Sequence, residues 1–389
     1  MIIIVFWYNI LLYSPDNPFF ISFIKKNLID FQRSSYVDSF SGSHDVVDCG
    51  LSKGPSVEVY KKNNIHVDLR GDVYLGHYTP SELELRLKDE IRKRYGLTDH
   101  QKVFIGAGSF GLIEKIAHKF TVDGSFLGFF PQFNEVPSEF ECSGFFLNFS
   151  FWMKDNQIKD NYIEDFLSSA HLFKPKVIYI DNPNNPTGFL FPKKDIQKIS
   201  DYCEMNDILL IIDETLGDYV EDYNSATNIV ASNKNTIVIR SFSKGFGLAA
   251  YRVGYMIVNS EISSFFDKIV PPFQTSAHSL ELAIAVHQKR DILLPQIRID
   301  ISNFKKQLIS YLQKKQIYTC PTNDSVPILT CYSKKIIDLQ KELLNVGILT
   351  ESLSLFSDLI NLSYDNYTRI AIPFLEKEQN ELLHRINGL

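Results

Sequence analysis

The amino-acid sequence predicts an α/β fold: a large domain with a mainly parallel sheet sandwiched by helices, plus a smaller α+β domain. From about residue 80, apolar segments of strand length alternate with amphipathic helical segments. These apolar segments are nearly continuous, which is typical of parallel strands buried on both faces. After about residue 275 the pattern changes to long helical segments, followed by strand, helix, strand and helix.

The composition excludes several functional classes. The chain has 389 residues, of which 44% are hydrophobic, so it can bury the cores of two domains. The net charge of −6, without a basic block, argues against a nucleic-acid partner. The five cysteines and nine histidines show no metal-ligand spacing. We therefore expect reduced thiols, a cytoplasmic location and no metal site.

The first 13 residues are apolar but too short to span a bilayer, and no basic residue precedes them. Three interpretations remain open: they pack on the protein, they are a translated leader before the true start, or they touch a membrane surface. We expect an apolar N-terminal extension of unclear role over residues 1–30 and a segment joining the small domain over 31–75. The large domain is expected over 76–275 and the small domain over 276–389, without a membrane partner.

In the large domain, the charged segment 81–96 predicts a helix that ends at Gly96. The elements expected after it are a strand over 102–105, a helix over 110–120, a strand over 125–130 and a turn over 131–139. Further on, we expect strands over 174–180, 208–213 and 235–241, a helix over 193–206, loops over 181–188 and 242–252, and an apolar segment over 253–258.

In the small domain, residues 278–315 predict long helical stretches. The segments 325–332, 334–347, 368–373 and 377–386 then predict strand, helix, strand and helix.

The segment VFIGAGSFGLIEKI contains Gly106, Gly108 and Gly111 in the spacing G-x-G-x-x-G. Such a match alone is a weak sign of a dinucleotide site, which also needs an acidic residue at the end of the next strand. Here that strand is followed by Pro131 and Gln132. A glycine loop before a helix can instead hold a single phosphate through backbone N–H groups and the helix dipole. A nicotinamide oxidoreductase is therefore disfavoured.

Polar residues follow several predicted strands at the edge where α/β proteins bind ligands. Asp181 and Asn185 follow one strand, Asp213 ends the next, and Lys244 and Arg252 come after a third. Each residue type alone is common in a turn, a helix cap or a solvated surface. Their joint occurrence in this order indicates one site.

Three segments resemble the pyridoxal-phosphate aminotransferases of fold type I, in the class I/II group. They are NPNNPTG (182–188), IIDE (211–214) and SFSKGFGLAAYRVGY (241–255). The sequence is most similar to the branch of histidinol-phosphate aminotransferase and threonine-phosphate decarboxylase, over about residues 65 to 385. The resemblance implies an aspartate aminotransferase-like fold, with pyridoxal 5'-phosphate bound by the large domain.

The resemblance also implies catalytic roles. Lys244 would form the Schiff base with the cofactor and move the substrate proton, which requires a lowered pKa. Asp213 would face the pyridine nitrogen and keep it protonated. Asn185 would bind the phenolic oxygen, Phe133 would stack on the ring, and Arg369 would grip the substrate α-carboxylate.

The phosphate-binding set implied by the resemblance surrounds the glycine loop. It consists of Gly108, Ser109, the amide of Phe110, Ser241, Ser243 and Arg252. Tyr78 matches a tyrosine that reaches the cofactor phosphate of the other subunit. That match implies a homodimer with shared active sites.

Some positions depart from the family pattern. Leu216 stands where many relatives carry a tyrosine that contacts the phenolic oxygen, and Thr330 or Cys331 stands where histidinol-phosphate enzymes usually carry a phosphate-binding arginine. The second departure argues against a phosphorylated substrate. Pro131, Phe133 and Glu135 look more like the threonine-phosphate decarboxylase branch.

The sequence thus predicts an aminotransferase acting in amino acid metabolism, between an α-amino acid and a 2-oxo acid. Two alternatives remain. One is a pyridoxal-phosphate-dependent decarboxylase or other biosynthetic tailoring enzyme on the same fold. The other is a non-catalytic cofactor-binding module.

Overall fold

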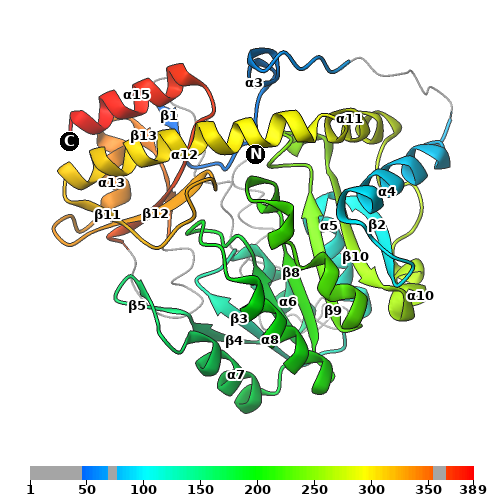
Figure 1. Ribbon diagram of the computed structural model, residues 1–389. Coiled ribbons are helices and arrows are strands. Elements are labelled where there is room, and N and C mark those ends of the chain that lie inside the picture. Colours follow the sequence, from blue (N-terminus) through cyan, green and yellow to red (C-terminus); the bar gives the residue numbers. More distant parts are fainter. Residues whose placement is uncertain (1–45, 69–76, 354–364) are drawn as a thin grey trace, which may run out of the picture.

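The computed structural model describes residues 46–68, 77–353 and 365–389 (Figure 1). The extension predicted over 1–30, and much of the segment predicted over 31–75, lie outside the described residues. A seven-stranded sheet and a four-stranded sheet dominate the described part of the chain.

The seven-stranded sheet has the order β2-β10-β9-β8-β7-β3-β4. Strands β9, β8, β7, β3 and β4 run parallel to one another, whereas β10 is antiparallel to both β2 and β9. The prediction of a mainly parallel sheet is therefore confirmed. The strands are β2 (Gln101–Ala107), β3 (Ser125–Phe130), β4 (Phe146–Phe151), β7 (Val177–Asp181), β8 (Leu209–Asp213), β9 (Thr236–Ser241) and β10 (Val253–Asn259).

Helices cover both faces of this sheet, as the continuous apolar strands require. Successive strand residues point to opposite faces, and Val177 and Ile178 accordingly belong to two different apolar clusters. One face packs against α4 (Ser81–Tyr95), α7 (Tyr162–Phe173), α8 (Lys193–Met205), α9 (Ile229–Ser232) and α11 (Ala277–His287). The other packs against α5 (Gly108–Lys115), α6 (Glu135–Ser143) and α10 (Ser260–Ile269).

The four-stranded sheet is antiparallel, with the order β11-β12-β15-β14. Its strands are β11 (Ile317–Thr319), β12 (Ile328–Ser333), β14 (Glu351–Ser352) and β15 (Tyr367–Ala371). The helices of this part are α12 (Arg290–Lys314), α13 (Leu339–Asn345) and α15 (Glu376–Asn387). The long helix α12 runs from α11 across to this second sheet (Figure 1).

The first described residues join the C-terminal part. Strand β1 (Val47–Asp48) pairs in parallel with β13 (Ile348–Leu349), and the short helix α3 (Val57–Lys62) follows. The Tyr60 hydroxyl of α3 donates a hydrogen bond of 2.8 Å to the Phe246 carbonyl, in the loop after β9. This segment therefore passes between the two sheets. Within the described ranges, no helix is both long enough and apolar enough to cross a membrane.

Several predicted boundaries were wrong. The turn predicted over 131–139 stops where α6 begins, because Pro137 lies in the first turn of that helix, where a missing N–H costs nothing. The helix predicted over 110–120 is α5 followed by a π-helical turn over Ile116–Phe120. The helical stretch predicted over 278–315 is interrupted between α11 and α12, and the helix predicted over 334–347 shortens to α13.

The sequence did not predict the elements between α6 and β7. Strand β4 lies at the sheet edge, where Phe146 is 79% exposed, so it lacks the continuous buried pattern of the central strands. The hairpin of β5 (Met153–Lys154) and β6 (Gln157–Ile158) is too short to produce a periodic signal. The loops around β8 to β10 also contain short 3₁₀ turns: Gly217–Tyr219, Asp222–Asn224, Ala226–Asn228 and Ala249–Tyr251.

A buried lysine organises the turn before β12. Lys305 of α12 is fully buried, and its ammonium donates to the hydroxyl of Thr322 and to the carbonyls of Asn323, Val326 and Ile328 at 2.6–2.8 Å. Four acceptors around one ammonium satisfy a group that is costly to bury alone.

We expect Lys305→Met to lower the free energy of unfolding by roughly 2–4 kcal/mol, because several buried acceptors lose their donor. Lys306→Met is the matched control, since Lys306 is 64% exposed in its ion pair with Asp324, itself 61% exposed. The control should stay within about 0.5 kcal/mol of the native protein. Urea unfolding measures both variants, and equal midpoints would contradict a structural role for Lys305.

Candidate functional site

A cavity of about 440 Å³ lies at the carboxyl ends of the parallel strands. Strand register builds it: β7 and β8 pair so that Asp181 lies directly beside Asp213, and Asp213 in turn lies beside Ile239 of β9. Residues from the glycine loop, the loop after β9, the N-terminal segment and the second sheet complete the lining. The cavity therefore lies where an open α/β sheet binds ligands.

Asp213 is buried at the base of the cavity. One carboxylate oxygen accepts the Thr215 N–H at 2.8 Å, and the other accepts the Tyr179 hydroxyl at 3.1 Å. Burial raises the pKa of Asp213, while these hydrogen bonds favour its anion. A cationic group placed beside it would favour the anion further. The chemistry of Asp213 thus suits the protonated nitrogen of an aromatic ring.

Asp181 ties two loops together. Its Oδ2 accepts the backbone N–H groups of Phe133 at 3.0 Å and Asn185 at 2.9 Å, and its Oδ1 accepts the Asn184 side-chain amide at 2.8 Å. Burial raises the pKa of Asp181 to about 7, although these three hydrogen bonds oppose the rise. Asp181 therefore fixes the backbones of the predicted stacking aromatic and of the predicted phenolate ligand.

Lys244 lies in the loop after β9, and its half-buried side chain lines the cavity. The ammonium donates a hydrogen bond of 2.5 Å to the Ser52 carbonyl of the N-terminal segment. Burial, with contributions from Arg369 and Arg252, lowers the pKa of Lys244 to about 8, and Glu351 opposes this shift. A lysine with such a pKa is about one-tenth neutral amine at pH 7, a far larger nucleophilic fraction than an ordinary lysine has.

The glycine loop lies against the loop after β9, and the two form a candidate phosphate cradle. Gly108 begins α5 with a φ of +79°, and a Cβ added there would overlap the Arg252 guanidinium. Ser109 Oγ accepts the Thr215 hydroxyl at 3.1 Å, and Ser243 also lines the cavity. A helix start, hydroxyls and an arginine together suit a dianion.

Arg369 reaches the cavity from β15 and is buried. Its Nη1 donates to the Asn185 side-chain oxygen at 2.9 Å, and its Nη2 donates to the Gly50 carbonyl and pairs with Glu351 of β14. The arginine thus connects the loop after β7, the N-terminal segment and the second sheet.

Most predicted site residues meet in this cavity. Those that line it are Ser109, Phe110, Phe133, Asn185, Asp213, Ser243, Lys244, Arg252 and Arg369. Gly108 packs behind Arg252, and Ser241 lies one layer back, where its hydroxyl donates to Ser243 Oγ at 2.8 Å.

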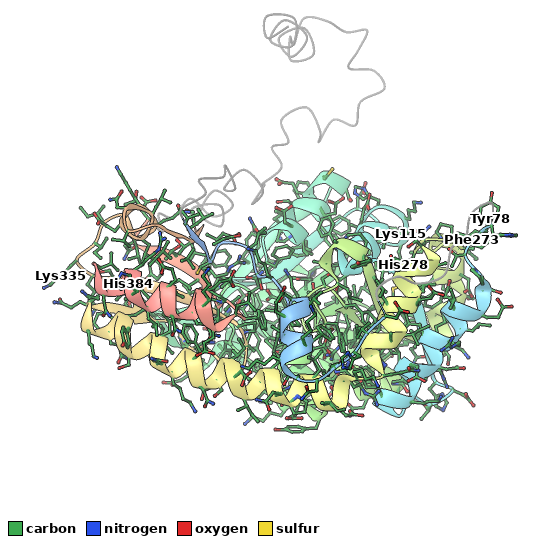
Figure 2. All side chains as sticks on the ribbon, turned by 90° about the horizontal axis from the view of Figure 1, so that it is seen from above. Tyr78, Lys115, Phe273, His278, Lys335 and His384 are labelled. Carbon is green, nitrogen blue, oxygen red and sulfur yellow. The ribbon has the colours of Figure 1, made fainter. Side chains whose placement is uncertain are left out.

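Tyr78 lies away from the cavity. It is 80% exposed and stacks on Phe273 with ring centroids 5.0 Å apart. Figure 2 shows both rings at the end of the molecule opposite to His384 and Lys335. Within the described chain, Tyr78 does not line the cavity that contains the predicted phosphate-binding residues.

Sequence reasoning missed four residues that shape the site: Tyr179, Thr215, Glu351 and Ser52. Thr215 follows Asp213 closely and could have been found from its place beyond a strand end. Tyr179 looks like an ordinary strand aromatic. Glu351 and Ser52 come from distant segments with no motif around them.

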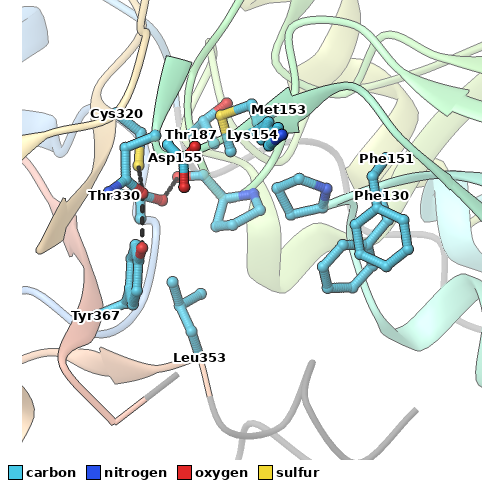
Figure 3. A pocket seen from close by; sticks show the side chains of 13 residues that line it. Phe130, Phe151, Met153, Lys154, Asp155, Thr187, Cys320, Thr330, Leu353 and Tyr367 are labelled. Carbon is cyan, nitrogen blue, oxygen red and sulfur yellow. Dashed lines mark hydrogen bonds between the residues drawn. The ribbon is translucent and has the colours of Figure 1, made fainter. Parts of the chain in front are cut away.

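The structure shows what surrounds the positions that depart from the family pattern. Leu216 lines the cavity, so its position offers an apolar contact where many relatives are expected to offer a hydroxyl. Thr330 donates a hydrogen bond of 3.0 Å to the Pro186 carbonyl, and Cys331 is buried. Thr330 faces a second, smaller cavity of about 120 Å³ (Figure 3). There Asn156 accepts hydrogen bonds from Tyr367 at 2.7 Å and Cys320 at 3.9 Å, which links the hairpin β5–β6 to the second sheet.

The residues present fit pyridoxal 5'-phosphate. The phosphate cradle lies at one end, Asp213 at the base, and Lys244 within the same cavity. An aromatic ring from Phe133 and an amide from Asn185 complete the contacts that a flat, anionic pyridine derivative needs.

Comparisons with known proteins agree with this assignment. Residues 50–386 match the family model described as aminotransferase class I and II. The histidinol-phosphate aminotransferase of Methanocaldococcus jannaschii is 26% identical over 343 residues, which cover 87% of this chain and 88% of that protein.

Solved structures share the fold. The histidinol-phosphate aminotransferase from Sinorhizobium meliloti in complex with pyridoxal-5'-phosphate superposes with a TM-score of 0.75 at 18% identity, covering 94% of this chain and 98% of that one. The aspartate aminotransferase from Thermus thermophilus with maleate gives a TM-score of 0.76 at 14% identity, covering 94% and 99%. These neighbours confirm the predicted aspartate aminotransferase-like, fold type I architecture.

We expect Gly108→Ala to weaken binding of pyridoxal 5'-phosphate roughly tenfold or more, because the new methyl group needs a strained φ and displaces Arg252. Gly111→Ala is the matched control in the same loop, since its added Cβ would lie 3.5 Å from Ala107, an ordinary contact. Titration of the cofactor into the cofactor-free variants, followed by absorption, measures both affinities. Equal affinities would show that the cradle does not hold the phosphate.

Proposed function

The chain belongs to the class I and II aminotransferases, and we propose that it moves an amino group between an α-amino acid and a 2-oxo acid through a Schiff base on Lys244. The family membership confirms the resemblance found in three sequence segments and makes the protein a pyridoxal-phosphate-dependent transferase of amino acid metabolism. The observation that carries the role of Lys244 is its buried amine, with a pKa of about 8, in the same cavity as Asp213 and Arg252.

Different side chains of this protein would carry out different parts of the reaction. The bound cofactor supplies an electron-accepting ring when a proton leaves the substrate α-carbon. Lys244 Nζ would take and return that proton, because its lowered pKa makes the neutral amine far more populated near pH 7 than in an ordinary lysine. Asp213 would keep the pyridine nitrogen of the cofactor protonated, and the Asn185 side-chain amide would donate to its phenolic oxygen.

Binding and orientation fall to other groups. The phosphate cradle of Ser109, Ser243 and Arg252 anchors the cofactor at one end. Phe133 covers the ring, and its backbone is fixed by Asp181. Arg369 would orient the carboxylate of an amino acid or 2-oxo acid once its ion pair with Glu351 opens.

The amino donor is a separate part of the proposal. The relative from Methanocaldococcus jannaschii is named for histidinol phosphate, so L-histidinol phosphate is the first donor to assay, with L-glutamate as the reference amino acid. Thr330 and Cys331 stand where histidinol-phosphate enzymes usually carry a phosphate-binding arginine, and neither residue is a cation. Their presence favours an amino donor without a phosphate. Release of carbon dioxide without a 2-oxo acid would instead identify the decarboxylase alternative.

We also propose a cytoplasmic homodimer. Tyr78 and Phe273 form an exposed aromatic pair, at 80% and 54% exposure, and such a pair is typical of a surface that a partner covers. Tyr78 would then reach the cofactor phosphate in the partner subunit. Light scattering of the native protein and of Tyr78→Ala, combined with cofactor affinity, tests this arrangement.

Lys244→Ala should lose roughly a thousandfold or more in amino-group transfer, because it removes both the covalent attachment and the proton carrier. Borohydride reduction followed by mass spectrometry should locate the cofactor on the Lys244 peptide of the native protein only. Lys268→Ala, on the exposed side of α10, is the control and should retain native activity. Full transfer activity in Lys244→Ala would refute the proposal.

The rate of covalent cofactor attachment should rise with pH and level off above about pH 8, because the neutral amine of Lys244 is the nucleophile and its pKa is lowered to about 8. The rate rises with pH because Lys244 is a base. Below its pKa the ammonium form dominates, and each increase of one pH unit raises the fraction of neutral amine about tenfold. Stopped-flow mixing of cofactor-free protein with pyridoxal 5'-phosphate measures the profile. A rate that keeps rising to pH 10 would show an ordinary lysine.

A further inference from the structure

A buried carboxylate lies beside the arginine that is proposed to bind the substrate carboxylate. Glu351 of β14 is directly opposite Arg369 of β15 in the strand register, and the two side chains form an ion pair. The side chains are only 4% and 5% exposed, respectively. Glu351 also lines the cavity, and it is close enough to Lys244 to raise the pKa of that amine.

Three of the five N–H donors of Arg369 are engaged inside the protein. Nη1 donates to Asn185, and Nη2 donates to the Gly50 carbonyl and faces Glu351. Among the described residues, Nε finds no hydrogen-bond partner, but this atom is buried away from solvent. An incoming carboxylate therefore cannot take two donors of the fork unless Glu351 moves away.

We propose that Glu351 is a specificity-determining residue: its carboxylate competes with a substrate carboxylate for Arg369 and favours amino donors that carry a neutral hydroxymethyl group in its place. The proposal rests on the aminotransferase function proposed above. An amino alcohol leaves the Glu351–Arg369 pair intact, so no unpaired charge is buried. An amino acid must displace Glu351 and leave it in the cavity without its arginine, which is costly.

The surroundings of Glu351 indicate that it competes with a substrate carboxylate for Arg369 and is not needed to hold Arg369 in place. Burial raises the pKa of Glu351, whereas Arg369 and Lys244 lower it, so the anion depends on these two cations. Arg369 already has two neutral anchors in Asn185 and Gly50, which hold its guanidinium in place without Glu351. Removing the negative charge should therefore free the fork and leave its position unchanged.

The test compares L-histidine with L-histidinol, which differ only in a carboxylate against a hydroxymethyl group. In Glu351→Gln, we expect the kcat/KM ratio of histidine to histidinol to rise about tenfold or more, mainly through a lower KM for histidine. Glu135→Gln is the matched control, since it removes the same charge from the same cavity away from Arg369. It should change the ratio by less than about threefold.

A second measurement does not depend on turnover. Maleate, a dicarboxylate, is titrated calorimetrically into the holoenzyme, and Glu351→Gln should bind it about tenfold more tightly than the native protein. Unchanged or weaker maleate binding overturns the proposal, because it would mean that Glu351 merely positions Arg369. If no amino acid tested with a 2-oxo acid is turned over by the native protein while maleate binding still tightens in Glu351→Gln, the proposed function fails and the role of Glu351 stands.

The Gln variant keeps an oxygen that can accept from Arg369, so we expect it to fold. Should it fail to fold, Glu351→Asp provides the second variant, because it withdraws the carboxylate by one methylene group. It should shift the histidine-to-histidinol ratio in the same direction by a smaller factor. A shift in the opposite direction contradicts the proposal.

Discussion

The parallel register of β7, β8 and β9 is the constraint on which the rest of the site depends. Parallel strands end at one edge, and the pairing of Asp181 with Asp213 places two carboxylates side by side there. Both are buried, so each needs donors. Asp213 takes them from Tyr179 and Thr215, and Asp181 takes them from the loops that present Phe133 and Asn185. The loops that carry Phe133 and Asn185 are therefore held in place because the buried carboxylate of Asp181 needs hydrogen-bond donors.

The cations around the cavity are also explained by the buried carboxylates, which need positive charge or hydrogen-bond donors nearby. Lys244, Arg252 and Arg369 face a site that contains several carboxylates; the first two come from the loop after β9 and the third from β15. The N-terminal segment joins them, since Ser52 accepts from Lys244 and Gly50 accepts from Arg369. A segment that lies far away in sequence thus connects the lysine loop of the large sheet to the arginine of the small sheet.

The sequence predicted the fold class and most of the site because both depend on local patterns. Continuous apolar strands indicate a covered parallel sheet, and residues such as Lys244 and Asn185 lie in compact motifs. The edge strand β4 was missed because one of its faces is exposed, as Phe146 shows. Tyr179 and Glu351 were missed because their roles arise from pairing across strands, which one strand's sequence does not contain. Tyr78 was predicted from its motif, and its proposed contact lies in a partner subunit.

The pairing of Glu351 with Arg369 shows why a sequence motif alone does not determine which substrate the site prefers. The arginine motif on β15 predicts a carboxylate-binding site, but the fork is available only if its strand neighbour is neutral or can move. An antiparallel ladder fixes that neighbour, because a residue and its cross-strand partner have Cβ atoms about 5 Å apart. A single acidic residue on β14 therefore changes which ligand charge the cavity accepts, while every motif residue stays in place. Substrate preference in this chain is set by the ladder of the second sheet as much as by the residues that hold the cofactor.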